Sequence, residues 1–311
     1  MDSQQKCKIC NKEFATQRGL HLHIKKQHKV ELKDYYLKHF PRLSKHYGKK
    51  IKFKNANQYL SDQFTNKQEL LDWCDNGDER EVKDYLKKIL GDRIKEKELK
   101  YAPNHLELQI KELPGIDVYK NFFGSYGEIC KELEIDLMFN KSLPKKFFEE
   151  DVDDSMKIFI DTREQKPLRF KNSDEMKLDF GEYTAAGYYY TYTYIDRKSE
   201  GDFKSTLSSG NLDRFKRELE RAREFNSYVF VVIESNLEKI KKRNIFASHK
   251  VNLPYIWHNM RLISHEYRDV CQFVFAQSRK GSERIIPKIL KYGRRIWDVD
   301  LQYFIDQKLI S

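Results

Sequence analysis

The amino-acid sequence predicts a mixed α/β domain in its C-terminal half, preceded by a helical middle region and a small ββα module. Three observations support this prediction. Strand-forming runs alternate with helical spacing after residue 157, and residues 61 to 150 have the pattern of short helices. Near the N-terminus, cysteines and histidines have the spacing of metal ligands. The predicted regions are 1–32, 33–150 and 155–311.

Length and composition exclude several classes of protein. The chain has 311 residues, of which 34% are charged and 39% hydrophobic, and this suits modest domains better than one large apolar core. No stretch approaches the roughly 20 apolar residues that cross a bilayer, and the first residues carry no signal-peptide run. The five cysteines are an odd number and do not suggest a disulfide framework. We therefore expect an intracellular protein with reduced thiols and no membrane partner.

The positive charge is concentrated at one end. The formal net charge is +11, and residues 1–60 hold 15 Lys and Arg against 4 Asp and Glu, so the whole excess lies there. DNA, RNA or another anionic surface is expected to contact this end. The alternative is a solvated basic tail.

The same end carries a metal-binding motif. Two residues separate the cysteines of a pair, twelve residues follow before a histidine, and four more precede a second histidine. These ligands are Cys7, Cys10, His23 and His28. The spacing is that of a Cys2His2 zinc finger, and Phe14 and Leu20 fall at its two core positions. It predicts a structural Zn²⁺, since so short a segment has little other source of folding energy.

The positions of the finger that would face base edges are Thr16, Gly19 and Leu22, counted back from His23. None is an Arg, Asn or Gln that could make a bidentate contact with a base. We therefore expect the finger to position the protein through phosphate contacts. The cations expected to make them are Arg18, Lys25, Lys26 and Lys29. A finger that binds protein is the alternative.

The helical middle region is predicted from three stretches, 67–73, 79–90 and 126–133, which Pro and Gly pairs interrupt. An acidic stretch over 147–154 then predicts a linker.

Beyond this linker the pattern predicts strands over 157–161, 188–195, 228–233 and 272–276, with helices over 212–225 and 282–290. The apolar run 229–233 is typical of a central strand covered on both faces.

Candidate catalytic residues follow or end these strands. In an extended strand, Asp196 and Lys198 point the same way while Arg197 points to the other side. Hydrolysis of a phosphodiester needs a divalent metal on oxygen ligands, an activated water and a cation. Glu182 and Asp196 suit the metal and Lys198 the water or the phosphate, while Asp161 and Glu164 could add a metal contact or orient the ligands. Taken alone, such groups also occur as solvated surface ions.

The order of these motifs resembles the XPF-type nucleases, a branch of the PD-(D/E)XK superfamily. Their D-x-R-E, G-D-Y and E-R-K motifs match residues 161–164, 181–183 and 196–198. The resemblance implies a restriction-endonuclease-like sheet flanked by helices and an endonuclease, dependent on Mg²⁺ or Mn²⁺, for branched or flapped DNA. It implies the following catalytic residues: Asp161, Glu164, Glu182, Asp196 and Lys198. Of these, Asp161, Glu182 and Asp196 would bind Mg²⁺.

The resemblance also implies DNA contacts from Arg163, Arg214 and Arg217. Two departures stand against it: Glu182 and Asp196 exchange the family's Asp and Glu, and no tandem helix-hairpin-helix module follows residue 290. The second departure leaves open whether the protein forms a homodimer. The basic N-terminus would then replace the missing DNA-holding element.

The middle segment 113–130 is similar to a small DNA-binding module found beside phage-borne and homing endonucleases, which implies a phage-type source. Its aromatic residues could equally form the core of a helical subdomain. The protein is expected with DNA inside the cell, in the host cytoplasm if phage-encoded or in the nucleus if eukaryotic. Alternatives left open are a site-directed homing-type endonuclease, a catalytically silent DNA-binding scaffold on a nuclease fold, and a protein that binds or cleaves RNA.

Overall fold

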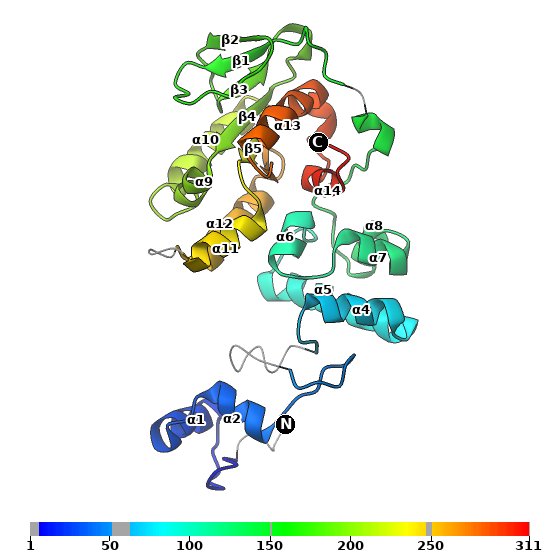
Figure 1. Ribbon diagram of the computed structural model, residues 1–311, viewed down its shortest axis with the longest axis vertical. Coiled ribbons are helices and arrows are strands. Elements are labelled where there is room, and N and C mark those ends of the chain that lie inside the picture. Colours follow the sequence, from blue (N-terminus) through cyan, green and yellow to red (C-terminus); the bar gives the residue numbers. More distant parts are fainter. Residues whose placement is uncertain (1–5, 52–62, 150, 247–250, 311) are drawn as a thin grey trace. The chain divides into compact units, whose positions relative to one another are not determined.

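The computed structural model describes residues 6–51, 63–149, 151–246 and 251–310. It divides into two compact units, Met1–Lys88 and Ile89–Ser311, and the division falls inside helix α5 (Glu79–Lys97). Figure 1 labels helices and strands of both units. Along the described ranges, no helix combines the length and apolar character needed to cross a bilayer.

The first unit begins with the region predicted as a ββα module, in which the described residues form a bridge and a helix but no regular strand. A single antiparallel bridge pairs Lys6 with Glu13, and α1 (Gln17–His23) continues into the π-helical turn η2 (Ile24–His28). Helix α2 (Leu32–His39) then packs on this module. The buried core they share consists of Cys7, Leu20, Ile24, Tyr35, Tyr36 and Ile51, with Phe14 packed against it. Both predicted core residues are therefore in place, and α2 extends the module beyond residue 32.

Helices α4 (Lys67–Asn76) and the first part of α5 complete the first unit. The Asn66 side chain caps α4 by accepting a hydrogen bond from the Glu69 N–H at 2.9 Å. The Trp73 ring packs between Phe64 and Tyr85, with centroid distances of 5.2 and 5.7 Å. The predicted helices over 67–73 and 79–90 are confirmed, and both extend further toward the C-terminus.

The second unit contains the remaining helices of the predicted middle region. They are α6 (His105–Ile110), α7 (Ile116–Phe123) and α8 (Tyr126–Glu132). The His105 backbone N–H donates to Asp300 Oδ2 at 2.8 Å, and the His105 ring lies 3.0 Å from Asp306 Oδ2. These bonds join α6 to the chain's last helix, α14 (Leu301–Asp306). The middle region after residue 89 thus folds with the C-terminal sheet.

A six-stranded mixed sheet in the order β2-β1-β3-β4-β5-β6 forms the centre of the second unit. Its strands are β1 (Ile158–Asp161), β2 (Ser173–Met176), β3 (Tyr183–Ala185), β4 (Thr193–Lys198), β5 (Tyr228–Ile233) and β6 (Cys271–Phe275). Strand β3 runs antiparallel to β1 and β4, whereas β4, β5 and β6 are mutually parallel. The fold class predicted from the sequence, a mixed sheet flanked by helices, is confirmed.

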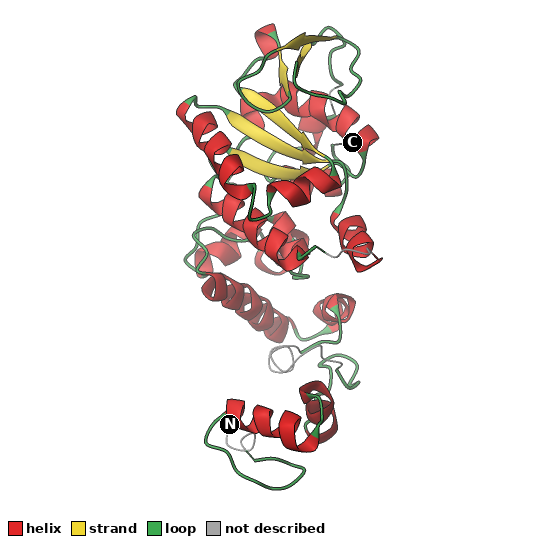
Figure 2. Ribbon diagram, turned by 90° about the vertical axis from the view of Figure 1, so that its left-hand side faces the viewer, coloured by secondary structure: helices red, strands yellow, loops and turns green. Residues whose placement is uncertain are grey.

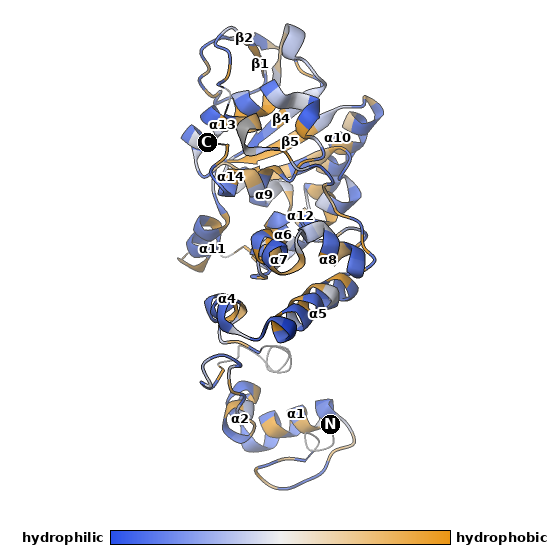
Figure 3. Ribbon diagram, turned by 90° about the vertical axis from the view of Figure 1, so that its right-hand side faces the viewer, coloured by the Kyte–Doolittle hydropathy of each residue, from blue (hydrophilic) through white to orange (hydrophobic). Residues whose placement is uncertain are grey.

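Strand β5 is buried along its whole length because helices cover both faces of the sheet (Figure 2). Tyr228, Phe230 and Val232 face α13 (Arg279–Tyr292), the 3-10 turn η5 (Gly293–Ile296) and α14. The alternate residues face the other layer of helices. That layer consists of α9 (Glu200–Thr206), α10 (Leu212–Glu224), α11 (Leu237–Phe246) and α12 (Leu253–Glu266). Figure 3 shows hydrophobic colour along β5, as the apolar run predicted.

Two predictions need correction. The strand predicted over 188–195 begins only at Thr193, because Gly187 and Tyr192 adopt φ of +58° and turn the chain before it. The stretch predicted as a linker starts with residues that pack on the core: Phe148, in the 3-10 turn η3 (Lys145–Phe148), is 2% exposed and contacts the Tyr292 ring. Strands β2 and β3 were not predicted.

Candidate active site and metal cluster

Four candidate zinc ligands converge in the first unit. The ligand atoms of Cys7, Cys10, His23 and His28 all lie within 4.8 Å of one another. Cys7 Sγ is 3.5 Å from His28 Nε2, and Cys10 Sγ is 3.2 Å from His23 Nε2. Two thiolates and two imidazoles at these separations form a donor set that fits one tetrahedral Zn²⁺. The motif prediction and the geometry agree on which residues could hold a metal ion.

The π-helical turn explains how His23 and His28 can meet. In an ordinary α-helix, residues three or four apart lie on the same face, and these histidines are five apart. Widening the helix over Ile24–His28 brings the two Nε2 atoms within 3.1 Å of each other. Lys29 then adopts φ of +53° and ends the turn. The uncommon helix type is therefore a consequence of the ligand spacing.

The cations predicted to contact phosphates from this module are all exposed: Arg18, Lys25, Lys26 and Lys29. Of the predicted base-facing positions, Thr16 caps α1 by accepting a hydrogen bond from the Gly19 N–H at 3.1 Å. Leu22 is exposed and apolar.

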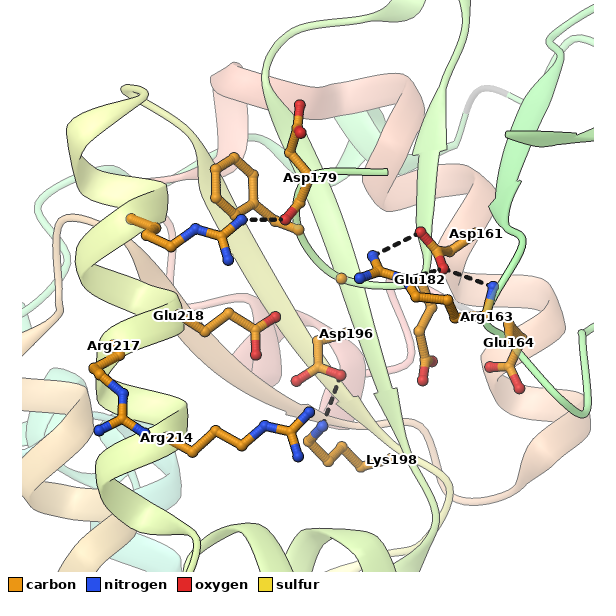
Figure 4. A pocket seen from close by; sticks show the side chains of 13 residues that line it. Asp161, Arg163, Glu164, Asp179, Glu182, Asp196, Lys198, Arg214, Arg217 and Glu218 are labelled. Carbon is orange, nitrogen blue, oxygen red and sulfur yellow. Dashed lines mark hydrogen bonds and ion pairs between the residues drawn. The ribbon is translucent and has the colours of Figure 1, made fainter. Parts of the chain in front are cut away.

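In the second unit, a pocket of about 520 Å³ lies beside strand β4 and helix α10. Every predicted catalytic residue lines it, namely Asp161, Glu164, Glu182, Asp196 and Lys198. So do the predicted phosphate-binding residues Arg163, Arg214 and Arg217. Figure 4 shows these side chains converging from the sheet, from the chain that leads into β3, and from α10. The tertiary structure thus collects in one place the groups that the sequence separates by more than fifty residues.

The position of Glu182 depends on the residue before it, Gly181, whose backbone conformation and close packing leave no room for a side chain. Gly181 has φ of +57°, and a Cβ on it would lie 2.5 Å from the Ile195 carbonyl oxygen. This close approach lets the Glu182 N–H donate to the Ile195 carbonyl at 2.7 Å, while the Glu182 carbonyl accepts from the Asp161 N–H at 2.8 Å. Glu182 is therefore fixed between the strand ends that carry Asp161 and Asp196.

Asp196 and Lys198 project from the same side of β4, as strand alternation predicts. Lys198 Nζ donates to Asp196 Oδ1 at 2.7 Å. Burial lowers the pKa of Lys198, but Asp196 and Glu182 outweigh it and hold the pKa above its ordinary value. The lysine is therefore a cation at neutral pH. The other oxygen, Asp196 Oδ2, is buried without a hydrogen-bond partner within the described part of the chain.

Other carboxylates lie near Asp196 Oδ2, the oxygen without a hydrogen-bond partner. Burial, together with the charges of Asp196 and Glu164, raises the pKa of Glu182 to about 9. Burial and Asp196 also raise the pKa of Glu218, which projects from α10 toward Asp196 in Figure 4. These carboxylates are unfavourably close when all are ionised. A hard divalent cation held by oxygen ligands would relieve this repulsion.

Glu182 and Asp196, with Glu218 beside them, therefore fit a divalent metal by donor chemistry and by the unpartnered oxygen. Within the described ranges, the Cys and His cluster is the one group of three or more Cys, His, Asp or Glu residues that is compact enough to hold a metal ion as it stands. The carboxylate group is more open, which suits Mg²⁺ because this ion usually keeps several water ligands.

Asp161 has a different environment from the other carboxylates. Its Oδ1 accepts from the Arg163 backbone N–H and from Nε, both at 2.7 Å, and its Oδ2 accepts from Arg163 Nη2 at 2.9 Å and the Leu178 N–H at 2.7 Å. These bonds, led by the one from the Arg163 side chain, hold the pKa of Asp161 at about 2 although burial opposes them. Both oxygens are thus already occupied by donors. The resemblance implies a DNA contact from Arg163, whereas here its side chain pairs with Asp161.

Glu164 is held by Arg197, the residue that points away from Asp196. Arg197 Nη2 lies 2.8 Å from Glu164 Oε2, and its Nη1 lies 3.1 Å from Glu234 Oε1. Burial raises the pKa of Glu164, but the Lys166 N–H and Arg197 bonds outweigh it and lower that pKa. Arg197 also donates its backbone N–H to Glu182 Oε2 at 3.1 Å. This arginine organises the acidic side of the pocket.

Sequence reasoning missed three residues that line the pocket. They are Asp179, Glu218 and Arg221. Glu218 follows Arg214 by one helical turn within the predicted helix 212–225, so helical spacing could have placed it on the same face as Arg214. Arg221 donates to the Asp179 carbonyl at 2.9 Å, a tertiary contact that no local pattern indicates.

Comparisons with known proteins give only distant similarity. No protein-family model matches the chain, and no curated protein matches it. Among solved structures, the chain is similar to an XPF from Aeropyrum pernix, with 17% identity over 48% of this chain and 72% of that chain and a TM-score of 0.35. A complex of the same kind of protein with DNA shows 16% identity over 50% of this chain and 84% of that chain, with a TM-score of 0.33.

Proposed function

We propose that this protein is a metal-dependent DNA endonuclease that hydrolyses phosphodiester bonds in the pocket beside β4 and α10. One observation carries the proposal. A buried carboxylate group with an unpartnered oxygen, Asp196 Oδ2, lies beside a protonated lysine, and exposed arginines line the same pocket. An acidic group for a cation next to basic groups for a phosphate is what phosphodiester hydrolysis needs.

The residues divide the work as follows. Glu182 and Asp196 would hold Mg²⁺ or Mn²⁺, and Glu218 would complete the acidic wall. A cation bound there supplies positive charge and a water of lowered pKa. Lys198 donates a hydrogen bond to a phosphate oxygen and stabilises the charge that develops on it. Arg214 and Arg217, both exposed, bind the flanking phosphates.

We assign Asp161 and Glu164 to positioning. Asp161 orients Arg163 and the chain around Leu178, and Glu164 orients Arg197, which in turn holds Glu182. The proposal therefore leaves Asp161 out of the metal ligands that the resemblance implies. The four hydrogen bonds to Asp161 would have to rearrange before it could bind a cation.

The proposal extends to the first unit. Cys7, Cys10, His23 and His28 would bind a structural Zn²⁺, and the exposed cations around α1 and η2 would hold the DNA backbone. Branched or flapped DNA is the proposed substrate, since the groups assigned to DNA in both units suit phosphates rather than base edges. The three predicted regions, the intracellular location and the phage-type source stay predictions.

The test is cleavage of labelled linear duplex, single strand, flap, fork and four-way junction, with Mg²⁺, with Mn²⁺ and with neither ion. Lys198→Ala should reduce cleavage by about 100-fold or more, as loss of a charge-stabilising group does. The matched control is Lys131→Ala, because Lys131 is exposed, pairs only locally with Glu128 and does not line the pocket. Intact DNA binding without cleavage in either ion would overturn the proposal in favour of a silent scaffold, and cleavage restricted to RNA would overturn the substrate.

A further inference from the structure

A second pocket of the same unit lies between helices and away from the carboxylate group. It has a volume of about 360 Å³ and is lined by side chains from α5, α6 and α12. No residue that lines the first pocket lines this one. Its lining is basic on one side and apolar on the other.

The basic side carries four permanent cations and one carboxylate. The cations are Arg93, Lys97, Lys111 and Arg261. The carboxylate, Glu107, is already engaged: its Oε1 accepts from Arg93 Nε at 3.0 Å and Nη2 at 2.6 Å, and its Oε2 lies 3.3 Å from the His265 ring. Glu107 therefore neutralises Arg93, and Glu96 pairs with Lys97 at 2.6 Å. The positive charges of Lys111 and Arg261 are left in excess.

Arg261 is the more deeply buried of the two pocket cations that have no acidic partner in the described ranges, the other being Lys111. It is 9% exposed, and no carboxylate forms an ion pair with it in the described ranges. Its Nη2 instead lies 2.8 Å from His258 Nδ1, which must accept the bond because a guanidinium can only donate. An almost buried guanidinium whose partner is a neutral ring is costly, and an anion in the pocket would offset that cost.

The pKa values of the neighbouring groups also reflect an excess of positive charge. Burial lowers the pKa of Lys111, and Arg93 and Lys97 lower it further. Burial also lowers the pKa of His258, with Arg261, Lys97 and Lys111 adding to the effect. Repulsion among like charges on three helices is relieved by one shared anion.

The apolar side of the pocket is formed by Ile110, Trp257 and Met260. The Trp257 ring packs on Phe203 with a centroid distance of 5.8 Å, which holds it in place. An aromatic side chain next to a cation cluster matches a ligand that has a flat ring and a phosphate.

We propose that this pocket binds the phosphate of a nucleotide, with Arg261, Lys111 and Lys97 around the phosphate and Trp257 on the side of the base. The nucleotide could come from two sources, a free mononucleotide or the phosphorylated end of a DNA strand. The site is independent of the proposed cleavage reaction, because none of its residues takes part in it.

The experiment measures binding by calorimetry to the full-length protein carrying Lys198→Ala, without divalent metal. The probes are dAMP, deoxyadenosine, and one oligonucleotide with and without a 5′ phosphate. We expect dAMP to bind and deoxyadenosine to bind much more weakly. Arg261→Met should weaken phosphate-dependent binding by about 10-fold or more, since it removes charge-assisted hydrogen bonds.

Lys111→Gln and Lys131→Gln form a matched pair, because both remove one charge from an exposed lysine and only Lys111 lines the pocket. Lys111→Gln should weaken binding several-fold even if Arg261→Met fails to fold, and Lys131→Gln should change nothing. If the variants weaken the binding of dAMP, the ligand is a free nucleotide. If they weaken only the binding of the 5′-phosphorylated oligonucleotide, the ligand is a DNA end. If neither probe binds, or if Lys111→Gln and Lys131→Gln behave alike, the proposal is wrong.

Discussion

The two candidate metal sites of this protein are built in opposite ways. The Cys and His cluster takes its four ligands from residues 7 to 28, and these atoms lie within 4.8 Å of one another. The carboxylate pocket draws Glu182, Asp196 and Glu218 from the chain before β3, from β4 and from α10, and is more open. We therefore expect the short module to depend on an ion for its folding, whereas the large sheet can hold an unfavourable group of charges in place without one.

The largest expected effect tests the dependence of the first module on zinc. Removing the ion with a chelator should unfold α1 and η2, because structural zinc sites contribute about 10 to 16 kcal/mol in comparable modules. Hydrogen exchange should show lost protection in the first unit and none lost in the sheet. Cys10→Ser should reproduce this result, while Cys74→Ser, which changes a cysteine of the same unit outside the cluster, should not. If the amides of α1 stay protected from exchange without zinc, the first module does not depend on its ion, and the two sites do not differ in this respect.

The second prediction concerns the carboxylate pocket, where function and stability should separate. Asp196→Asn and Glu182→Gln should each reduce cleavage by about 1,000-fold, a loss typical of groups that act in the transition state. Glu182→Gln should leave the melting temperature measured without metal unchanged, because a carboxyl group with a pKa of about 9 is already neutral at pH 7, whereas Asp196→Asn removes the charge that pairs with Lys198. Glu128→Gln, an exposed glutamate on α8, is the control. A large loss of stability in both variants would mean that these carboxylates are structural.

The third prediction sharpens the account of how Glu182 is placed. Gly181→Ala should lower the free energy of unfolding by about 2 kcal/mol or more, because it puts a Cβ against the Ile195 carbonyl at positive φ. Gly115→Ala is a suitable comparison, since a Cβ there meets nothing within 4 Å and φ is −75°. Chemical denaturation measures both. If Gly181→Ala and Gly115→Ala have the same free energy of unfolding, the backbone near Glu182 can shift to accommodate the added Cβ.

The smallest effect is the reactivity of the remaining thiols. Burial raises the pKa of Cys74 to about 11 and that of Cys130 to about 12. A raised pKa keeps a thiol neutral to higher pH, so at pH 8 fewer than about 1 in 100 of these groups is a thiolate, the reactive form. Alkylation at pH 8 should therefore modify Cys7 and Cys10 after zinc removal and leave Cys74 and Cys130 unmodified in native protein. Rapid modification of Cys130 would contradict the buried environment of α8.

Several elements followed from local pattern alone. The apolar run 229–233 predicted the central strand because both faces of β5 are covered, and strand alternation predicted that Asp196 and Lys198 share a side. Strand β2 was not predicted because its residues, Ser173–Met176, are mostly exposed and polar and so show no apolar pattern. The false start of the strand predicted at residue 188 came from a run of tyrosines, which favour strands but here lie in a turn.

The candidate catalytic residues were also found from sequence, through motif order, but their individual roles were not. The resemblance implies that Asp161 and Glu182 both bind Mg²⁺. Donors from Arg163 and Leu178 occupy Asp161, whereas burial and neighbouring charges keep Glu182 near neutrality. That difference depends on residues from other parts of the chain.

By itself, the sequence determined features that lie within one short stretch of the chain. These are the candidate zinc ligands between residues 7 and 28, the strand that carries Asp196 and Lys198, and the concentration of positive charge before residue 60. Only the tertiary structure decided which carboxylates are satisfied, that Glu218 joins them, and that Arg261 is buried without an acidic partner. The physical reason is that backbone preferences act over a few residues, whereas the burial and repulsion that set the charge of a side chain depend on every element packed around it.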